Sequence, residues 1–269
     1  AEMTNAMQRY ARDSTRLGIP LFLAEECPHG HMAIGTTVFP TAIGRASTWN
    51  TELEERVAEI VALEARLQGG HIGYGPVLRW SRVEEGYGED PFLSGSMGSA
   101  YVRGLQGGNV GSGENVIATL KHFTAYGVPE GGHNAGMAHV GVRELLTELS
   151  YPFEMAVKAG ALSLMTAYNE VDGIPCTANP FLTNQLLRDQ WGFSGFVVSD
   201  LYAIDGLMSQ RVAAGRDEAG ILALRSGVDS DLGGNCFSAD LVRACREGRL
   251  AEADIDRAVS RILRLKFKM

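Results

Sequence analysis

Short apolar runs alternate with longer amphipathic segments from one end of the chain to the other. The apolar runs have the length and the bounding turn residues of buried strands. The longer segments repeat their apolar residues at helical spacing, as Leu53, Val57, Ile60 and Val61 do. The predicted strands are 20–24, 72–78, 115–121, 161–168, 195–200 and 227–232. The predicted helices are 51–61, 94–105, 143–159, 182–190, 218–225, 239–247 and 252–266.

Strands that are separated by helices predict a parallel sheet with right-handed crossovers. No Pro- or Ser-rich linker divides the chain, so residues 1–269 are interpreted as one α/β domain. Two local signals refine the helices. Thr51 and Glu54 have the spacing of a capping box, and Pro152 is expected to bend or restart the helix around it.

Charged residues stand at the ends of three predicted strands. Asp200 closes one, Lys121 and His122 follow a second, and Glu25 and Glu26 follow a third. The carboxyl ends of parallel strands meet at one end of an α/β fold, where such folds keep their ligand sites. Because these groups end many strands rather than gather at one switch point, the pattern favours a TIM-type (β/α)8-like barrel over an open sheet. About six strands instead of eight indicate an incomplete or truncated barrel.

Charge and hydropathy limit the classes of partner. The chain carries 24 basic and 32 acidic residues, a formal net charge of −8. This charge disfavours nucleic acid and anionic membrane surfaces as partners and is compatible with a neutral polar substrate. No apolar stretch reaches the ~18 residues of a membrane span, and residues 1–5 show neither a basic start nor an apolar signal core. The compartment stays open between cytoplasm, periplasm and secretion.

The cysteines and histidines show no metal-ligand spacing. The four cysteines, Cys27, Cys176, Cys236 and Cys245, are scattered and are interpreted as buried or half-buried free thiols, with a Cys236–Cys245 disulfide as the open alternative. The histidines lack the H-E-x-x-H pattern, and the glycine-rich stretch 107–113 lacks the Lys-Ser/Thr of a phosphate loop. The sequence therefore predicts no metal and no cofactor.

Five motifs are more distinctive than any of these patterns. They are GIPL (18–21), CPHG (27–30), RWSRVEEGYGEDPF (79–92), KHFTAYG (121–127) and GFVVSD (195–200). In this order they resemble the N-terminal barrel domain of glycoside hydrolase family 3, in its β-glucosidase and β-xylosidase members. The resemblance covers essentially the whole chain.

The resemblance implies a retaining β-glycosidase that acts on terminal β-linked glucose or xylose. Asp200 would be the nucleophile that forms a covalent glycosyl-enzyme. Roles in binding the sugar are implied for Glu26, Arg82, Lys121, His122, Met165 and Tyr168. The chemistry agrees with this assignment, because retaining hydrolysis needs an ionised carboxylate beside the anomeric carbon, and a nearby lysine favours the ionised form.

The sequence departs from the family pattern in three places. The second domain, which usually supplies a Glu as general acid/base, is absent, so a C-terminal domain or a second chain would have to supply it. A segment that usually carries a sugar-binding Asp is missing between Leu78 and Arg79, which weakens the role implied for Arg82. The usual opening strand and helix are also expected to be missing. A single-barrel branch uses a His in a Pro-Gly-His-Gly run; residues 129–133, Pro-Glu-Gly-Gly-His, do not match it, so His133 is not assigned that role.

Two other interpretations stay open. Without its acid the chain could be a non-catalytic sugar-binding or structural fragment. An unrelated lyase or aldolase that uses Lys121 as a Schiff base is the more distant alternative. The acidic residues Glu84, Glu85, Glu89 and Asp90 are expected to orient Arg82 and Lys121 rather than to catalyse. A homo-oligomer is expected if the face that meets the second domain is exposed and apolar.

Overall fold

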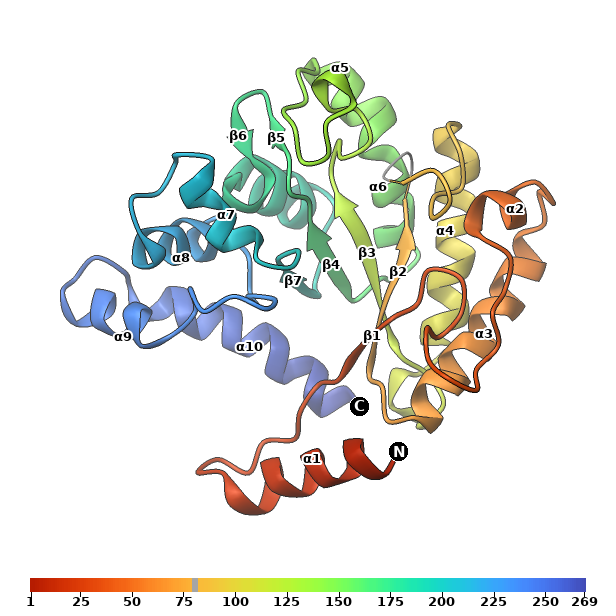
Figure 1. The fold of residues 1–269 in the computed structure, drawn as a ribbon, viewed down its shortest axis with the longest axis horizontal. Coiled ribbons are helices and arrows are strands. Elements are labelled where there is room, and N and C mark those ends of the chain that lie inside the picture. Colours follow the sequence, from red (N-terminus) through yellow and green to blue (C-terminus); the bar gives the residue numbers. More distant parts are fainter. Residues whose placement is uncertain (79–81) are drawn as a thin grey trace.

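The computed structural model describes residues 1–78 and 82–269. In these residues five strands form one parallel sheet, in the order β1-β2-β3-β4-β7 (Figure 1). The strands are β1 (Ala24–Glu26), β2 (Ile72–Val77), β3 (Ile117–Phe123), β4 (Ser163–Thr166) and β7 (Phe196–Val198). Helices join most of them in sequence, which confirms the predicted α/β fold with a barrel-like parallel sheet.

Helices cover the outer face of this sheet. They are α3 (Thr51–Leu67), α4 (Pro91–Gln106) and α6 (Tyr151–Lys158), which lie along β2 and β3 in Figure 1. Successive side chains of a strand point to opposite faces. Leu120, Leu164 and Val197 therefore join the large core under the helices. Met165, Phe196 and Val198, which are next to Leu164 and Val197 along the strands, point to the other face. They join a smaller inner cluster with Ile72, Val110, Ile117 and Leu265.

The remaining elements lie around this framework. The helices are α1 (Glu2–Ser14), α2 (Ala42–Ala46), α5 (Val142–Glu144), α7 (Ala203–Ser209), α8 (Arg216–Arg225), α9 (Ala239–Arg246) and α10 (Glu252–Lys268). Two segments are π-helical, η3 (Leu145–Leu149) and η5 (Phe181–Gln190), and three are short 3-10 turns, η1 (Val110–Ser112), η2 (Glu130–Gly132) and η4 (Cys176–Ala178). The hairpin β5 (Glu170–Val171) and β6 (Ile174–Pro175) was not predicted. The predicted break near Pro152 is confirmed, because α6 restarts after η3 with Pro152 in its first turn.

The first predicted strand is misplaced. β1 begins at Ala24, and the residues before it are irregular. Gln8 of α1 explains this, because its amide donates to Leu21 O at 2.8 Å and accepts from Leu21 N at 2.8 Å. A side chain therefore satisfies the backbone that a strand neighbour would otherwise pair. α1 also shows that a helix does precede the first motif, contrary to the expectation that it is missing.

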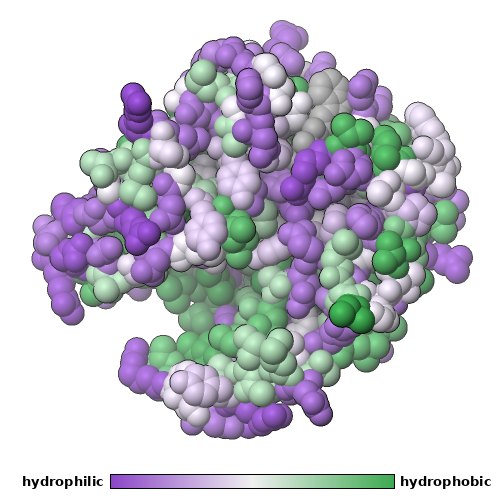
Figure 2. All heavy atoms as spheres, in the orientation of Figure 1, coloured by the Kyte–Doolittle hydropathy of each residue, from purple (hydrophilic) through white to green (hydrophobic). Residues whose placement is uncertain are grey.

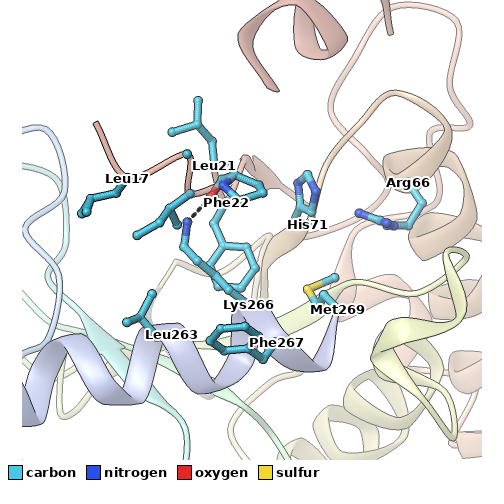
Figure 3. Close-up of a pocket in the computed structure, with 12 residues that line it drawn as sticks. Leu17, Leu21, Phe22, Arg66, His71, Leu263, Lys266, Phe267 and Met269 are labelled. Atoms are coloured by element: carbon cyan, nitrogen blue, oxygen red, sulfur yellow. Dashed lines mark hydrogen bonds between the residues drawn. The ribbon is translucent and has the colours of Figure 1, made fainter. Parts of the chain in front are cut away.

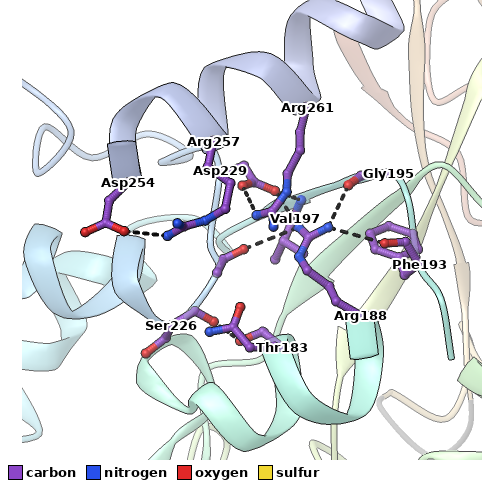
Figure 4. A network of polar contacts seen from close by, with 12 residues as sticks. Thr183, Arg188, Phe193, Gly195, Val197, Ser226, Asp229, Asp254, Arg257 and Arg261 are labelled. Atoms are coloured by element: carbon purple, nitrogen blue, oxygen red, sulfur yellow. Dashed lines mark hydrogen bonds and ion pairs between the residues drawn. The ribbon is translucent and has the colours of Figure 1, made fainter. Parts of the chain in front are cut away.

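The sixth predicted strand, 227–232, is also wrong. It forms a single bridge to the sheet, between Val198 and Ser230. The Asp229 carboxylate accepts the Val197 N–H at 2.8 Å, in place of a backbone carbonyl. The same carboxylate binds Arg188 of η5 at 2.7 Å and Arg261 of α10 at 2.8 Å (Figure 4). A buried side chain thus pins this segment to β7, and the sheet of the described residues has five strands instead of six.

Two helices begin at residues other than those predicted. The cap of α3 is Asn50, whose side chain accepts from Leu53 N at 2.9 Å, so the capping box of Thr51 and Glu54 is wrong. Glu54 instead turns inward and binds Arg45 at 2.8 Å. α4 begins at Pro91, before the predicted start, because the Asp90 carboxylate accepts from Leu93 N at 2.6 Å.

Two predictions about composition can be compared with the structure. All four cysteines are free, which removes the Cys236–Cys245 disulfide, and only Cys245 is half-buried rather than buried. No helix in the described part of the chain is both long enough and apolar enough to cross a bilayer.

An apolar hollow lies between α10 and the segment that follows α1. Figure 2 shows it above α1, with hydrophobic surface inside it. The cavity measures about 580 Å³, and Leu17, Leu21, Phe22, Leu263 and Phe267 form much of its wall (Figure 3). Its lining residues precede β1 and β2 or belong to α10. The hollow is therefore at the amino end of the strands, away from the end that carries the candidate site.

Candidate active site

Two charged strand ends meet directly. Lys121 of β3 donates to Glu26, the last residue of β1, with 2.7 Å between Nζ and Oε2. The Lys121 side chain is 2% exposed and that of Glu26 is 53% exposed. The pair therefore joins a buried cation to a carboxylate that faces solvent. This contact confirms that the predicted strand ends converge.

Asp200, at the end of β7, lies next to His122 at the end of β3. Asp200 follows β7, and its Oδ2 lies 3.6 Å from Nε2 of His122. That separation is too long for a hydrogen bond. Asp200 Oδ1 accepts from Leu201 N at 2.7 Å, whereas Oδ2 is buried and accepts no hydrogen bond from the described residues. The Tyr168 hydroxyl beside Asp200 donates its one proton to Leu201 O instead. The site therefore presents one buried carboxylate oxygen that is free to act on a bound molecule.

The local backbone explains how Lys121 and His122 both reach the site. Consecutive side chains of a regular strand point to opposite faces. The pairing of β3 with β4 shifts register between Leu120 and Phe123, so the strand is irregular at these two residues. Both side chains consequently lie at the carboxyl end of the sheet, one on Glu26 and the other beside Asp200.

Burial sets the protonation states of Asp200 and His122. It raises the pKa of Asp200 above its ordinary value, while the Leu201 N–H, the Tyr168 hydroxyl and the charges of Lys121 and Arg82 act in the opposite direction. Burial, together with the positive charges of Lys121 and Arg82, holds the pKa of His122 well below its ordinary value. His122 is therefore a neutral imidazole at neutral pH. A neutral donor beside a carboxylate suits the recognition of a hydroxyl group.

Three tyrosines surround Asp200. The Tyr168 hydroxyl donates to Leu201 O at 2.9 Å, and burial and the Asp200 charge raise its pKa. Tyr126 lies between His122 and Tyr168, with ring centroids 5.0 and 6.1 Å away. Tyr74 of β2 has a pKa raised to about 12 by burial and by the charges of Glu26 and Asp200. The sequence predicted Tyr168 alone, although Tyr74 shares a strand face with Ile72 and Tyr126 lies in the KHFTAYG motif.

Arg82 and Met165 complete the predicted set. Arg82 is 46% exposed and donates to Glu85 with 2.7 Å between Nε and Oε2. Of the four acidic residues expected to orient Arg82 and Lys121, Glu85 binds Arg82, whereas Asp90 caps α4. Lys121 pairs with Glu26 instead. Met165 is 2% exposed in the inner apolar cluster and is level with Val198 of β7. The neighbours of Arg82 at positions 79–81 in the motif lie outside the described residues.

The arrangement favours nucleophilic attack by Asp200 over Schiff-base formation at Lys121. A Schiff base needs a neutral amine, whereas Lys121 is buried in an ion pair with Glu26, and an ammonium has no lone pair to attack a carbonyl. A buried carboxylate with one free oxygen, ringed by donors, suits attack on an electrophilic carbon. In the described residues the one group of acids and thiols spaced to hold a metal, Asp205, Asp231 and Cys236, involves none of these side chains.

Comparison with known proteins places this site in context. Residues 1–265 match the family described as "Glycosyl hydrolase family 3 N terminal domain". The "Periplasmic beta-glucosidase" of Salmonella typhimurium is 34% identical over 98% of this chain and 35% of its own length. The "Beta-xylosidase" of Formosa agariphila is 40% identical over 100% of this chain and 40% of its own length.

Solved structures agree with these relatives. A β-glucosidase from Erythrobacter marinus superposes with a TM-score of 0.96 and 38% identity, over 100% of this chain and 37% of that one. The β-glucosidase of Listeria innocua in complex with isofagomine gives a TM-score of 0.95 and 35% identity, over 100% of this chain and 38% of that one. The chain thus spans well under half the length of the proteins it matches.

Proposed function

The chain belongs to glycosyl hydrolase family 3, over the N-terminal domain of that family, and we propose that it is the nucleophile-bearing half of a retaining β-glycosidase. One observation carries the proposal. Asp200 presents a buried oxygen, Oδ2, that accepts no hydrogen bond from the described residues, at the strand ends where Lys121, Glu26 and His122 converge. Such an oxygen is available to attack an anomeric carbon.

In the proposed reaction Asp200 Oδ2 forms a bond to the anomeric carbon as the bond to the leaving oxygen breaks. The electron pair of that broken bond goes to the leaving oxygen, which takes up a proton. Water then attacks the anomeric carbon from the face that the leaving group occupied and loses a proton. The bond to Asp200 breaks, which frees the carboxylate, so configuration is retained. The positive charges of Lys121 and Arg82 favour the ionised form of Asp200 that the first step needs.

The surrounding groups are proposed to recognise the sugar. Glu26 and Lys121 supply a paired acceptor and donor, and His122 supplies a neutral donor next to the nucleophile. Arg82 adds a charged donor at the solvent edge. Tyr168 is held beside Asp200 by its bond to Leu201 O, and Met165 forms part of the apolar floor. Buried polar groups of this kind reject a sugar that lacks the matching hydroxyl.

The general acid/base is proposed to come from outside this chain. The relatives are more than twice as long as the segment they share with it. A Glu on a C-terminal domain, or on a second chain, would protonate the leaving oxygen. The relatives carry both glucosidase and xylosidase names, so we propose terminal β-linked glucose or xylose as the substrate. A non-catalytic sugar-binding fragment is the second candidate, since the acid contributes ~10²–10⁴-fold.

Azide provides a direct test that does not need the missing acid. The chain is incubated with 2,4-dinitrophenyl β-glucoside or β-xyloside, whose leaving group departs without protonation, and with sodium azide. Azide should intercept the glycosyl ester and give the β-glycosyl azide, because two inversions retain configuration. The α-azide would indicate a single displacement and contradict the mechanism. No azide-dependent product, with the sugar still bound, would favour the binding fragment.

The pH dependence of this reaction should report the charge of Lys121. That charge lowers the pKa of Asp200, so the Lys121→Met variant should have a higher Asp200 pKa and should lose activity at a higher pH as the solution is acidified. The acid limb of the pH profile of kcat/KM for azide transfer measures this shift. Lys121→Arg keeps the charge and should leave the limb near its wild-type position. If the acid limb of the Lys121→Met profile stayed at its wild-type pH, the ionisation of Asp200 would not control that limb.

A further inference from the structure

A second group of titratable side chains lies on α7 and on the loop before α9. Asp205 of α7 and the residues Asp231 and Cys236 of the loop before α9 each offer one ligand atom, and these three atoms lie within 4.8 Å of one another. Asp231 and Cys236 are close in sequence but Asp205 is distant from both, so their spacing gives no recognisable metal motif. None of the proposed catalytic or sugar-binding residues belongs to this group.

Each carboxylate uses one oxygen and leaves the other without a partner. Asp205 Oδ1 accepts from Arg216 Nε at 3.1 Å, and Asp231 Oδ2 accepts from Cys236 N at 2.8 Å. Asp205 Oδ2 and Asp231 Oδ1 are buried and have no hydrogen-bond partner among the described residues. Buried polar oxygens in native proteins nearly always have partners, so two orphaned oxygens in one place require an explanation.

The two orphaned oxygens point at the same place. A Cβ added to Gly234 would lie 2.5 Å from Asp205 Oδ2 and 2.6 Å from Asp231 Oδ1. Both oxygens therefore converge on the face of a glycine, where any side chain would collide with them. Two carboxylates that approach so closely in a buried place repel each other unless a proton or a cation lies between them.

The Cys236 thiol adds a third ligand atom beside the two carboxylates. Cys236 is 0% exposed, and no side-chain hydrogen bond joins it to a described residue outside the cluster. Burial and the charges of Asp205 and Asp231 raise its pKa to about 12. In the metal-free chain the thiol shares a hydrogen bond with the Asp205 carboxylate. A thiophilic cation would displace the thiol proton and use all three side chains.

An entry route is present. A cavity of about 400 Å³ lies between the loop and helices α9 and α10, and Asp231, Gly234 and Phe237 are part of its wall. An ion from solvent can therefore reach Asp231 without unfolding of the core. The acidic chain, with its formal net charge of −8, also favours the approach of cations.

We propose that Asp205, Asp231 and Cys236 bind one divalent, thiophilic metal ion of the Zn²⁺ type. Two carboxylate oxygens and a thiolate are an accepted mixed ligand set for this ion, and water would complete a tetrahedral site. The thiol gives its proton to solvent as the metal–sulfur bond forms, so binding strengthens as pH rises. The bound ion would fasten α7, which follows Asp200, to the loop before α9.

Cadmium reports the proposed site directly, because a cadmium–thiolate bond has a charge-transfer absorption band in the ultraviolet. Titration of the metal-free chain with Cd²⁺ should produce this band and saturate at one equivalent, and Zn²⁺ should abolish it by competition. Cys236→Ser should remove the band, whereas Cys245→Ser, which alters the half-buried cysteine of α9, should keep it. Zn²⁺ should raise the melting temperature of the wild type and of Cys245→Ser, but not of Cys236→Ser.

A second variant guards against loss of folding in Cys236→Ser. Asp231→Asn keeps the size of the side chain and removes one of the two converging charges. It should bind Cd²⁺ at least about tenfold more weakly, because altering even a residue that only supports a metal ligand costs about 10–100-fold. A charge-transfer band that persists in Cys236→Ser would overturn the proposal. So would a wild type that shows no stoichiometric band and no change in melting temperature with Zn²⁺. A proton shared by the two acids would then be the remaining explanation. Neither readout depends on glycosidase activity, so its outcome is separate from that of the proposed function.

Discussion

The Asp200→Asn variant is expected to lose turnover of activated β-glycosides by on the order of 10⁴-fold or more, the scale on which removal of a covalent nucleophile acts. An amide of the same shape has no charge with which to attack the anomeric carbon. Asp200 Oδ2 has no protein partner in the described residues, so the substitution breaks no hydrogen bond of that oxygen. Release of dinitrophenol, with and without azide, measures the loss.

The stability of the same variant separates a chemical role from a structural one. Burial raises the pKa of Asp200, so the folded state holds the proton more tightly than the unfolded state does. The charged carboxylate is therefore a cost to folding at neutral pH, and the cost falls as pH drops through the folded pKa. Asp200→Asn should melt at least as high as the wild type at pH 7. Turnover close to that of the wild type would contradict the assignment of the nucleophile.

Replacing Asp229 by Ala is expected to destabilise the fold by ~3–5 kcal/mol, the usual result of breaking a buried ion pair from one side. The Asp229 side chain is 1% exposed and holds Arg188 and Arg261 at 2.7 and 2.8 Å (Figure 4). It also takes the Val197 N–H of β7. The variant would leave two guanidinium groups and one backbone donor without their acceptor. Urea unfolding measures the free energy lost.

A neighbouring pair provides the matched control. Asp254 binds Arg257 at 2.7 Å within α10, where the two side chains are 19% and 43% exposed. Exposed pairs of this type are worth ~0–1 kcal/mol, so Asp254→Ala should be nearly neutral. If Asp229→Ala cost no more than Asp254→Ala, the buried network would not hold β7, and another cause would be needed for the missing sixth strand.

The parts of the fold that sequence could predict are those decided by periodicity. Apolar runs and helical spacing predict four of the five strands of the sheet, and the rule that parallel strands end together places Glu26, Lys121 and Asp200 at one end of it. Tyr74 was within reach of the same argument, because strand alternation puts it on the inner face with Ile72.

The parts that sequence could not predict depend on single side chains that replace backbone partners. Gln8 satisfies Leu21 and delays β1, and Asp229 takes the Val197 N–H and reduces the last strand to one bridge. Asn50 caps α3 because Glu54 is engaged by Arg45. Such contacts join residues far apart or choose between neighbours of equal propensity, and no local pattern records them. The group of Asp205, Asp231 and Cys236 is of the same kind.

The central claim, that Asp200 is a nucleophile in a site which this chain assembles alone, is tested most directly by trapping. The chain is incubated with 2,4-dinitrophenyl 2-deoxy-2-fluoro-β-glucoside, which needs no acid and whose fluorine slows release of the ester. Digestion and mass spectrometry should then find one fluoroglucosyl adduct, on the peptide that contains Asp200 and absent from Asp200→Asn. An adduct on another residue, or none in a folded chain that binds the sugar, would contradict the account.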